Sequence, residues 1–328
     1  MRKRNSLWFV IAGMLLTCSL LFSLSAVLAE DYPTKPLRLI VPFPPGGSND
    51  IVGRQIAAKL VDLLGKQVIV ENRGGAGTVI GTEQVAKSNP DGYTLLLSGN
   101  AYTIAPSLNK QLPYDPATSL IPIARLGTGP AVLTVHPSLP VNSVKELIAY
   151  LKQNPRKVVC ASVGIGTFNH LGAELFRIMA GVDFKIVQFK GGGPATVDHI
   201  GGHAPLMFGS LTQAMPQIKA GKVKPLGTGG LKRNAALPDL PTISEAGVPG
   251  YESNIWWGVH APAGTPKAVT DRLEKELKAI LNAPDTQKMF QAQGADADYL
   301  DSAEFGKFIT SESIKWARVI KESDIKPE

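Results

Sequence analysis

The stretch LRLIVPFPPGGSNDIVGRQIAAKL, residues 37–60, joins an apolar run to a helical pattern through prolines and glycines. The run at 37–41 predicts a buried strand, and residues 51–65 predict an amphipathic helix. Glycine lets a ligand approach the main chain, and the first N–H groups of a helix have no partner within it. We therefore expect the turn at 42–50 to hold a ligand as well as to start a helix.

The same order of apolar run, glycine-rich turn and helical pattern recurs along the chain. The expected strands of these five units are residues 37–41, 67–72, 93–98, 157–163 and 185–189. The helices expected after them are residues 51–65, 80–88, 103–109, 170–181 and 197–202. Further strands are expected at 205–210, 223–230 and 255–264, and long helices at 266–283 and 302–323. Apolar strands that alternate with helices are typical of a parallel sheet covered on both faces, so the predicted fold class is α/β.

The length of the chain predicts two lobes. About 300 residues exceed what one hydrophobic core usually serves. Residues 126–141 and 246–258 are rich in glycine and proline, and we expect both segments to cross between lobes. The predicted lobes are residues 30–129 together with 253–328, and residues 130–252. A chain that crosses twice forms a hinge with a cleft between the lobes.

The first 29 residues are expected to be an export signal that is removed. Arg2, Lys3 and Arg4 precede an apolar run, and the residues at 27 and 29 suit cleavage after Ala29. The alternative is an uncleaved anchor, since about 20 apolar residues can span a bilayer. Cleavage would place the mature protein in the periplasm and leave Cys160 without an intramolecular partner.

The charge balance argues against a nucleic acid partner. Without the three basic residues of the leader, the 34 lysines and arginines exceed the 27 acidic residues by only four. The chain has no run of five like charges. This balance permits attraction to small acidic ligands.

An acid group is the ligand that suits the glycine turns best. Gly46–Gly47, Gly74–Gly77, Gly164–Gly166 and Gly191–Gly193 all follow expected strands, where helix N-termini favour an anion. Three or four hydrogen bonds of about 1.5–3 kcal/mol each would supply the ~8 kcal/mol that micromolar binding requires. The alternative is that these turns only start helices.

Charged residues near the turns divide into two groups. Asp50 and Arg54 are four residues apart and are expected to form a structural pair. Lys190 and Arg73 are better placed to reach a ligand.

No catalytic residue, metal site or cofactor is predicted. The motifs GxSxG and HExxH are absent, and no phosphate-binding fingerprint is complete. His199 and His203 are four apart, but the two glycines between them would break the helix that a metal site needs. Cys160 lies in an apolar strand and is expected to be a buried, inert thiol. The Trp256–Trp257 pair is expected to line a cleft or to lie in the core.

Several motifs together resemble the solute-binding proteins of tripartite tricarboxylate transporters, the TctC or Bug family. They are YPTKPLRLIVPFPPGGSND, VIVENRGGAGTVIGTEQVAKSNPDGYTLLL, LPYDP, SVGIGTFNHLGAELFRIMAGVDF, FKGGGPATVDHIGG, LPDLPTISEAGVPGYE and APAGTP, in this order. The resemblance implies a type II periplasmic-binding-protein fold, in which two α/β lobes around a cleft close on a ligand. It also implies small carboxylates, amino acids or aromatic acids as ligands, and no catalysis.

Carried over by position, the resemblance implies ligand contacts in both lobes. In the first lobe these are Phe43, Pro45, Gly46, Gly47, Ser48, Asn49, Asp50, Gly75, Ala76, Gly77, Ser98, Asn100, Ala101 and Tyr102. In the second lobe they are Ser162, Gly164, Gly166, Thr167, His170, Lys190, Gly191, Gly192, Phe208, Gly209 and Ser210.

One departure from the family bears on the ligand. Where the family reads GGQVDLMFDN, this chain has GGHAPLMFGS, so Pro205 and Gly209 replace acidic residues expected at the pocket edge. An ammonium group needs a carboxylate partner. We therefore expect the pocket to prefer an acid without an amine.

The function predicted from the sequence is that of an exported, monomeric receptor. It would capture a small organic acid by lobe closure and deliver it to the membrane permease of a tripartite tricarboxylate transporter. One alternative is a sensor that presents its closed form to a sensor kinase. An exported hydrolase is the enzyme alternative, although the sequence shows no nucleophile and base for it.

Overall fold

The computed structural model describes residues 32–322. The expected leader and its cleavage after Ala29 lie outside these residues and stay predictions. Within residues 32–322, no helix combines the length and apolarity needed to cross a membrane.

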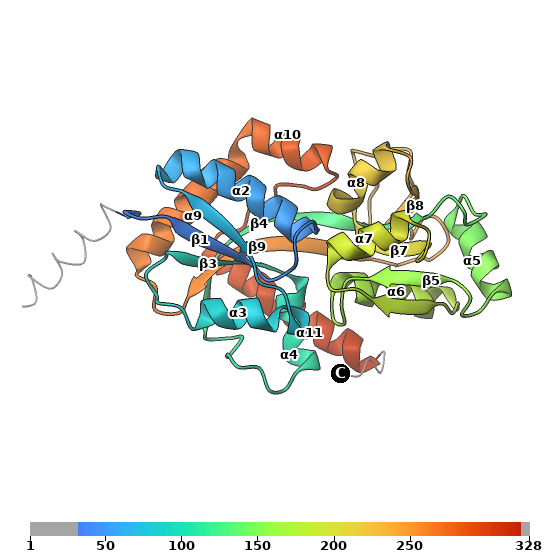
Figure 1. Ribbon diagram of the computed structural model, residues 1–328, viewed down its shortest axis with the longest axis horizontal. Helices are drawn as coiled ribbons and strands as arrows, with labels where there is room; N and C mark the ends of the chain where they lie inside the picture. Colours follow the sequence, from blue (N-terminus) through green and yellow to red (C-terminus); the bar gives the residue numbers. More distant parts are fainter. Residues whose placement is uncertain (1–31, 323–328) are drawn as a thin grey trace, which may run out of the picture.

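The first lobe is built on a mixed sheet. Strand β1 (Leu37–Val41) lies between β2 (Val68–Asn72) and β3 (Thr94–Gly99), parallel to both, and β9 (Asn254–Pro262) runs antiparallel to β3. The helices of this lobe flank the sheet on the left of Figure 1. They are α2 (Ser48–Leu64), α3 (Val79–Ala86), α4 (Asn100–Leu108), α9 (Lys267–Asn282), α10 (Pro284–Ala292) and α11 (Ser302–Glu322), with a short 3₁₀ turn at Ala76–Thr78.

The second lobe repeats this arrangement on a smaller sheet. Strand β5 (Val159–Ser162) lies between β6 (Lys185–Gln188) and β7 (Leu206–Ser210), parallel to both, and β8 (Lys224–Thr228) pairs with β4 (Leu120–Val135). The helices of this lobe are α5 (Val144–Gln153), α6 (Phe168–Ala180), α7 (Gly192–Ile200) and α8 (Leu211–Lys219). The predicted α/β class and its five strand–turn–helix units are confirmed.

Strand β4 connects the two lobes. Its first half pairs with β9 as far as Pro130, opposite Asn254, and from Ala131 on it pairs with β7. The second crossing lies beside the first, because the Ala131 N–H donates to the Ser253 carbonyl at 2.9 Å. Figure 1 shows β4 and β9 passing together between the lobes. The division at 129/130 and 252/253 stays a proposal, which this exchange of partners supports.

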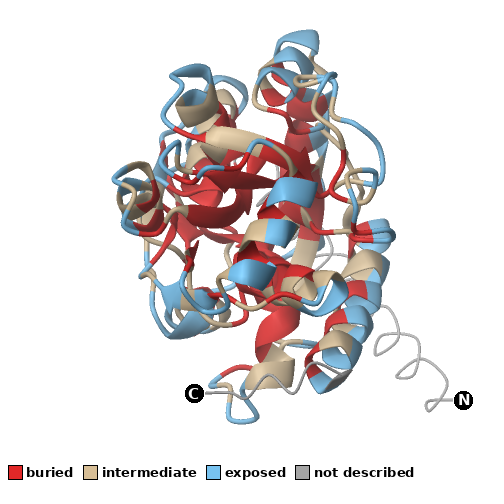
Figure 2. Ribbon diagram, turned by 90° about the vertical axis from the view of Figure 1, so that its right-hand side faces the viewer, coloured by how far each residue is buried: buried red, intermediate tan, exposed pale blue. Residues whose placement is uncertain are grey.

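Each lobe has its own hydrophobic core. The first is formed mainly by α2, α9 and the strands between them, and the second gathers around Phe176, Phe208 and Tyr251. Figure 2 shows the buried strands at the centre and exposed helix faces around them. Trp256 and Trp257 are both buried in the core, which decides between the two roles expected for them. Cys160 is also buried, as predicted.

Helix α11 contributes a further contact between the lobes. Trp316 and Ile320 near its end pack against Ile104 of α4 and Leu171 of α6 in one apolar cluster. Since α4 belongs to the first lobe and α6 to the second, this cluster joins the lobes at a point outside the β4 and β9 crossings. Figure 1 shows α11 below the junction of the two halves.

Candidate functional site

The turn after β1 is held in place by a carboxylate of the helix that it starts. Asp50 Oδ2 accepts from the Gly46 N–H at 3.0 Å, and Asp50 Oδ1 accepts from Asn72 Nδ2 at 2.9 Å. Arg54 Nη2 lies 2.9 Å from the same Oδ1, so the predicted structural pair is confirmed. Asn72 Nδ2 also donates to the Phe43 carbonyl at 3.0 Å. Both ends of the turn are therefore tied to β2.

The Asp50 side chain is stabilised in its charged, carboxylate form. Burial alone would raise the pKa of this carboxyl, but hydrogen bonds from Arg54, the Gly46 N–H and Asn72 hold the pKa below its ordinary value. Gly46 has φ +86°, a left-handed conformation that glycine adopts without strain.

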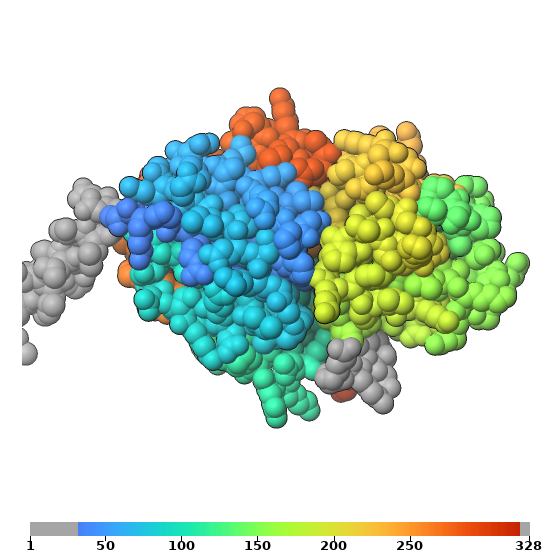
Figure 3. Space-filling view, in the orientation of Figure 1, coloured from blue at the N-terminus to red at the C-terminus, as the bar shows by residue number. Residues whose placement is uncertain are grey.

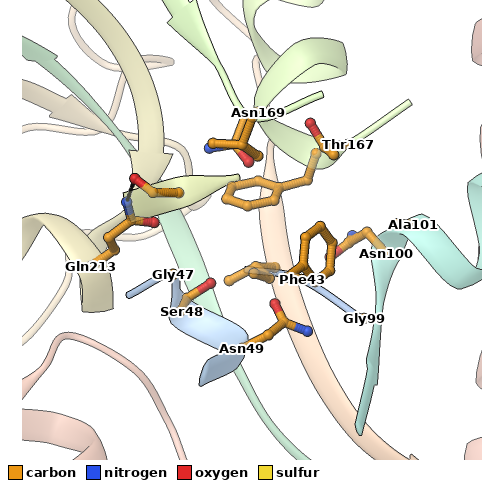
Figure 4. Close-up of a pocket in the computed structure, with 14 residues that line it drawn as sticks. Phe43, Gly47, Ser48, Asn49, Gly99, Asn100, Ala101, Thr167, Asn169 and Gln213 are labelled. Carbon is orange, nitrogen blue, oxygen red and sulfur yellow. Dashed lines mark hydrogen bonds between the residues drawn. The ribbon is translucent and has the colours of Figure 1, made fainter. Parts of the chain in front are cut away.

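A cavity lies between the lobes at this turn. It encloses about 450 Å³ between its atoms, including the part open to solvent. Figure 4 shows side chains of both lobes around it. The lining residues are Phe43, Gly47, Ser48, Asn49, Gly99, Asn100, Ala101, Val163, Thr167, Phe168, Asn169, Gly192, Gln213 and Ile255.

The cavity is bounded by the starts of helices. Its lining includes residues from the first turns of α2, α4, α6, α7 and α8. Each of these helices is the next element along the chain after a strand. The first N–H groups of a helix lack intrahelical partners, and the helix dipole is positive there. None of the lining side chains carries a charge. The site therefore favours an anion through main-chain and neutral polar donors.

The lobes touch beside the cavity where glycines of the second lobe meet Pro44 and Pro45 of the first. A Cβ atom at Gly193 would lie 2.7 Å from the Pro45 carbonyl oxygen, and one at Gly191 would lie 2.8 Å from Pro44 Cδ. Both distances are too short for real atoms, so these glycines are required for the contact. Figure 3 shows the blue surface of the first lobe meeting the yellow surface of α7 along a narrow seam.

The structure brings part of the predicted site together. Eight predicted residues line the cavity: Phe43, Gly47, Ser48, Asn49, Asn100, Ala101, Thr167 and Gly192. Among these, Asn100 is committed to structure, because its side chain donates to the Asn254 carbonyl and accepts from the Trp256 N–H. As ligand contacts, all eight stay predictions.

The other predicted residues lie outside this lining. They are Pro45, Gly46, Asp50, Gly75, Ala76, Gly77, Ser98, Tyr102, Ser162, Gly164, Gly166, His170, Lys190, Gly191, Phe208, Gly209 and Ser210. Some of them support the loops of the site without lining the cavity; Asp50, for example, accepts from the Gly46 N–H. His170 accepts from the Gly166 N–H, and burial lowers the pKa of its ring. Lys190 is exposed, and Arg73 pairs with Glu71.

The placement of Pro205 at the pocket edge is wrong. Pro205 precedes β7 and accepts from the His136 N–H, whereas the cavity lies beyond the other end of that strand. Gly209 and Ser210 line a second, smaller and mostly apolar cavity, and Gln213 lines both cavities. His199 also lines the second cavity, and both its ring nitrogens are hydrogen-bonded, to Thr134 and Ala204.

Six lining residues are not among the contacts named from the sequence: Gly99, Val163, Phe168, Asn169, Gln213 and Ile255. Of these, Gly99 and Val163 lie within the predicted segments 98–102 and 162–167. Phe168 and Asn169 directly follow Thr167, so the glycine turn before them already marked their position. Gln213 had no such signal, because no helix was expected after residues 205–210. Ile255 comes from the strand that returns across the hinge.

Known proteins match this chain over nearly its whole length. Residues 52–325 match the family described as tripartite tricarboxylate transporter family receptor. Protein BugT of Bordetella pertussis is 37% identical over 302 residues, which are 92% of this chain and 93% of that protein. A solved structure of an R. palustris protein with adipate is 35% identical, with a TM-score of 0.89, and covers 91% of this chain and 100% of its own. The periplasmic binding protein BugD is 38% identical, with a TM-score of 0.86 and coverages of 90% and 100%. The two lobes thus have the type II periplasmic-binding-protein fold.

Asp50→Asn is expected to loosen the ligand turn. Removing the charge weakens three hydrogen bonds, which should cost about 1–3 kcal/mol of unfolding free energy at pH 7. Because the folded pKa is depressed, the contribution of the charge is present above the ordinary value of 3.8 and is lost as the pH falls through the lower folded value. Urea denaturation at several pH values should show a gap between wild type and variant that narrows below about pH 4.

Asp239→Asn, an exposed change in the loop after β8, is the matched control and should leave stability within about 0.5 kcal/mol. A constant gap between wild type and Asp50→Asn from pH 7 to 3 would contradict the assigned role of the charge.

Proposed function

Because the chain belongs to the family of tripartite tricarboxylate transporter receptors, we propose that it is a periplasmic receptor that binds a small carboxylate between its lobes. The observation that carries this proposal is a cavity without charged side chains, surrounded by the starts of five helices. Such a site stabilises an anion by hydrogen bonds and dipoles rather than by an ion pair. The adipate in a similar solved structure supports the same ligand class.

One carboxylate of the ligand binds at the start of α2. Ser48 and Asn49 occupy the first two positions of this helix, where their N–H groups have no intrahelical partner. Figure 4 shows both side chains at the cavity. Asn49 Nδ2 is buried without a hydrogen-bond partner among the described residues. A ligand oxygen at this point would satisfy donors that are otherwise costly to leave unpaired.

Closure of the lobes completes the site. A ligand can shift a two-state equilibrium only through contacts that one state makes and the other lacks. Here those contacts come from the second lobe, at Thr167, Asn169, Gly192 and Gln213. The contacts of Pro44 and Pro45 with Gly191 and Gly193 lie outside the cavity lining, so they belong to the closed state without involving the ligand.

The family works with tripartite transporters, and we assign this chain the same role. The mature protein begins after Ala29, acts as a monomer and delivers its ligand unchanged to a membrane permease. Presentation of the closed form to a sensor kinase is the second candidate, since it would use the same cavity. The ligand lacks an amine, because the lining offers no carboxylate to pair with an ammonium.

Ser48→Ala tests the carboxylate position. The variant removes one hydrogen bond to a charged group, worth about 1.5–3 kcal/mol, so affinity should fall roughly 10- to 150-fold. The measurement is calorimetric titration of residues 30–328 with succinate, glutarate and adipate. Ser311→Ala, on the exposed face of α11, is the control and should bind as wild type does. The main-chain N–H at position 48 is kept in this variant, so equal affinities of Ser48→Ala and wild type would show that the Ser48 hydroxyl does not bind the acid.

Gly193→Ala tests closure of the lobes at a residue that does not line the cavity. The added methyl overlaps the Pro45 carbonyl only when the lobes meet, so it should penalise the closed state by about 1–3 kcal/mol. Affinity should then fall roughly 5- to 150-fold.

Gly306→Ala, in helix α11, is the matched glycine control, since its Cβ would lie 3.6 Å from Pro122 in ordinary contact. Binding by Gly193→Ala with wild-type affinity would argue against closure at this seam.

A further inference from the structure

Two amide side chains on the second-lobe side of the cavity have their orientations fixed. Asn169 Nδ2 donates to the Phe208 carbonyl at 2.7 Å. Gln213 Nε2 donates to the Gly192 carbonyl at 2.8 Å and to Thr196 Oγ1 at 2.5 Å. A main-chain carbonyl can only accept, so in each amide the nitrogen must face it. The oxygen of each amide is thereby turned the other way.

Both amide oxygens are left as unused acceptors. Among the described residues, none donates a hydrogen bond to Asn169 Oδ1 or Gln213 Oε1, although both residues are largely buried. Figure 4 shows the two side chains at the cavity with their oxygens turned toward its interior. The hydroxyl of Thr167 cannot supply the missing donor, because it donates to the Gly164 carbonyl at 2.7 Å. The donor has to come from what occupies the cavity.

The chemistry of the lining selects the donor. An ammonium would lose its hydration without gaining a carboxylate, since no lining side chain is charged and Asp50 is committed to Gly46, Asn72 and Arg54. A neutral hydroxyl donates one hydrogen bond and has little charge to desolvate. It can also accept from the free N–H groups at the start of α6.

We propose that this receptor selects hydroxylated carboxylates, whose hydroxyl donates to Gln213 Oε1 or to Asn169 Oδ1. The inference rests on the proposed function, since the carboxylate at α2 positions the hydroxyl-bearing carbon near the second lobe. An acid that lacks the hydroxyl gives neither oxygen this donor when the lobes close. Sites of this kind reject the analogue that lacks the polar group.

The test uses matched acids that differ in one group. Residues 30–328 are titrated by calorimetry with lactate and propionate, with malate, succinate and aspartate, and with 2-hydroxyglutarate, glutarate and glutamate, using both enantiomers of the chiral acids. In at least one series the hydroxy acid should bind at least 10-fold tighter than both the unsubstituted acid and the amino acid. Equal binding of hydroxy and unsubstituted acids, or tighter binding of an amino acid, would overturn the inference alone. If none of these acids bound, the proposed function would fail as well.

Variants separate recognition from a structural effect. At least one of the variants Gln213→Met and Asn169→Leu should reduce the ratio of the two affinities, by lowering that of the hydroxy acid more than that of its unsubstituted partner. Gln217→Met, one turn further along α8 and outside the lining of this cavity, should keep the ratio. A ratio unchanged in both Gln213→Met and Asn169→Leu would overturn the assignment to these two oxygens. The wild-type comparison stands even if one variant does not fold.

Discussion

Everything at this site depends on the close approach of two loops, one of which has only glycine at the contact. Pro44–Gly47 from the first lobe and Gly191–Gly193 from the second approach so closely that a methyl group would not fit at Gly193 or Gly191. This approach brings the starts of α2 and α7 to one cavity. The strands and helices of each lobe position these turns, and Asp50 holds the first of them from within α2.

The site lacks charged side chains, and this has consequences for selectivity. Main-chain donors recognise the charge of an acid but do not distinguish one acid from another. Identity must then be recognised by the neutral groups around them, which here are serine, threonine, asparagine and glutamine side chains and two phenylalanine rings. The hydrogen bonds of these amides with the protein decide which atom faces the ligand: an unpaired nitrogen at Asn49, and the oxygens at Asn169 and Gln213.

Much of the fold followed from the sequence, because apolar runs and glycine turns have local physical causes. The strands at β1, β2 and β3 and the helices at α9 and α11 were expected within a few residues of their observed bounds. Strand β4 was expected only as a crossing, since Pro122, Gly127 and Pro130 disfavour a strand, and its many partners come from distant segments. Gln213 could not be found for a similar reason: only the packing of α8 against α7 brings it to the cavity.

The most direct test of the central claim is a crystal structure of residues 30–328 with whichever of succinate, adipate and malate binds most tightly. The account predicts one acid between the lobes, with carboxylate oxygens within about 3 Å of the Ser48 and Asn49 N–H groups, and with Gly193 against Pro45. An acid bound elsewhere, or a carboxylate paired with a lysine or arginine side chain, would contradict it.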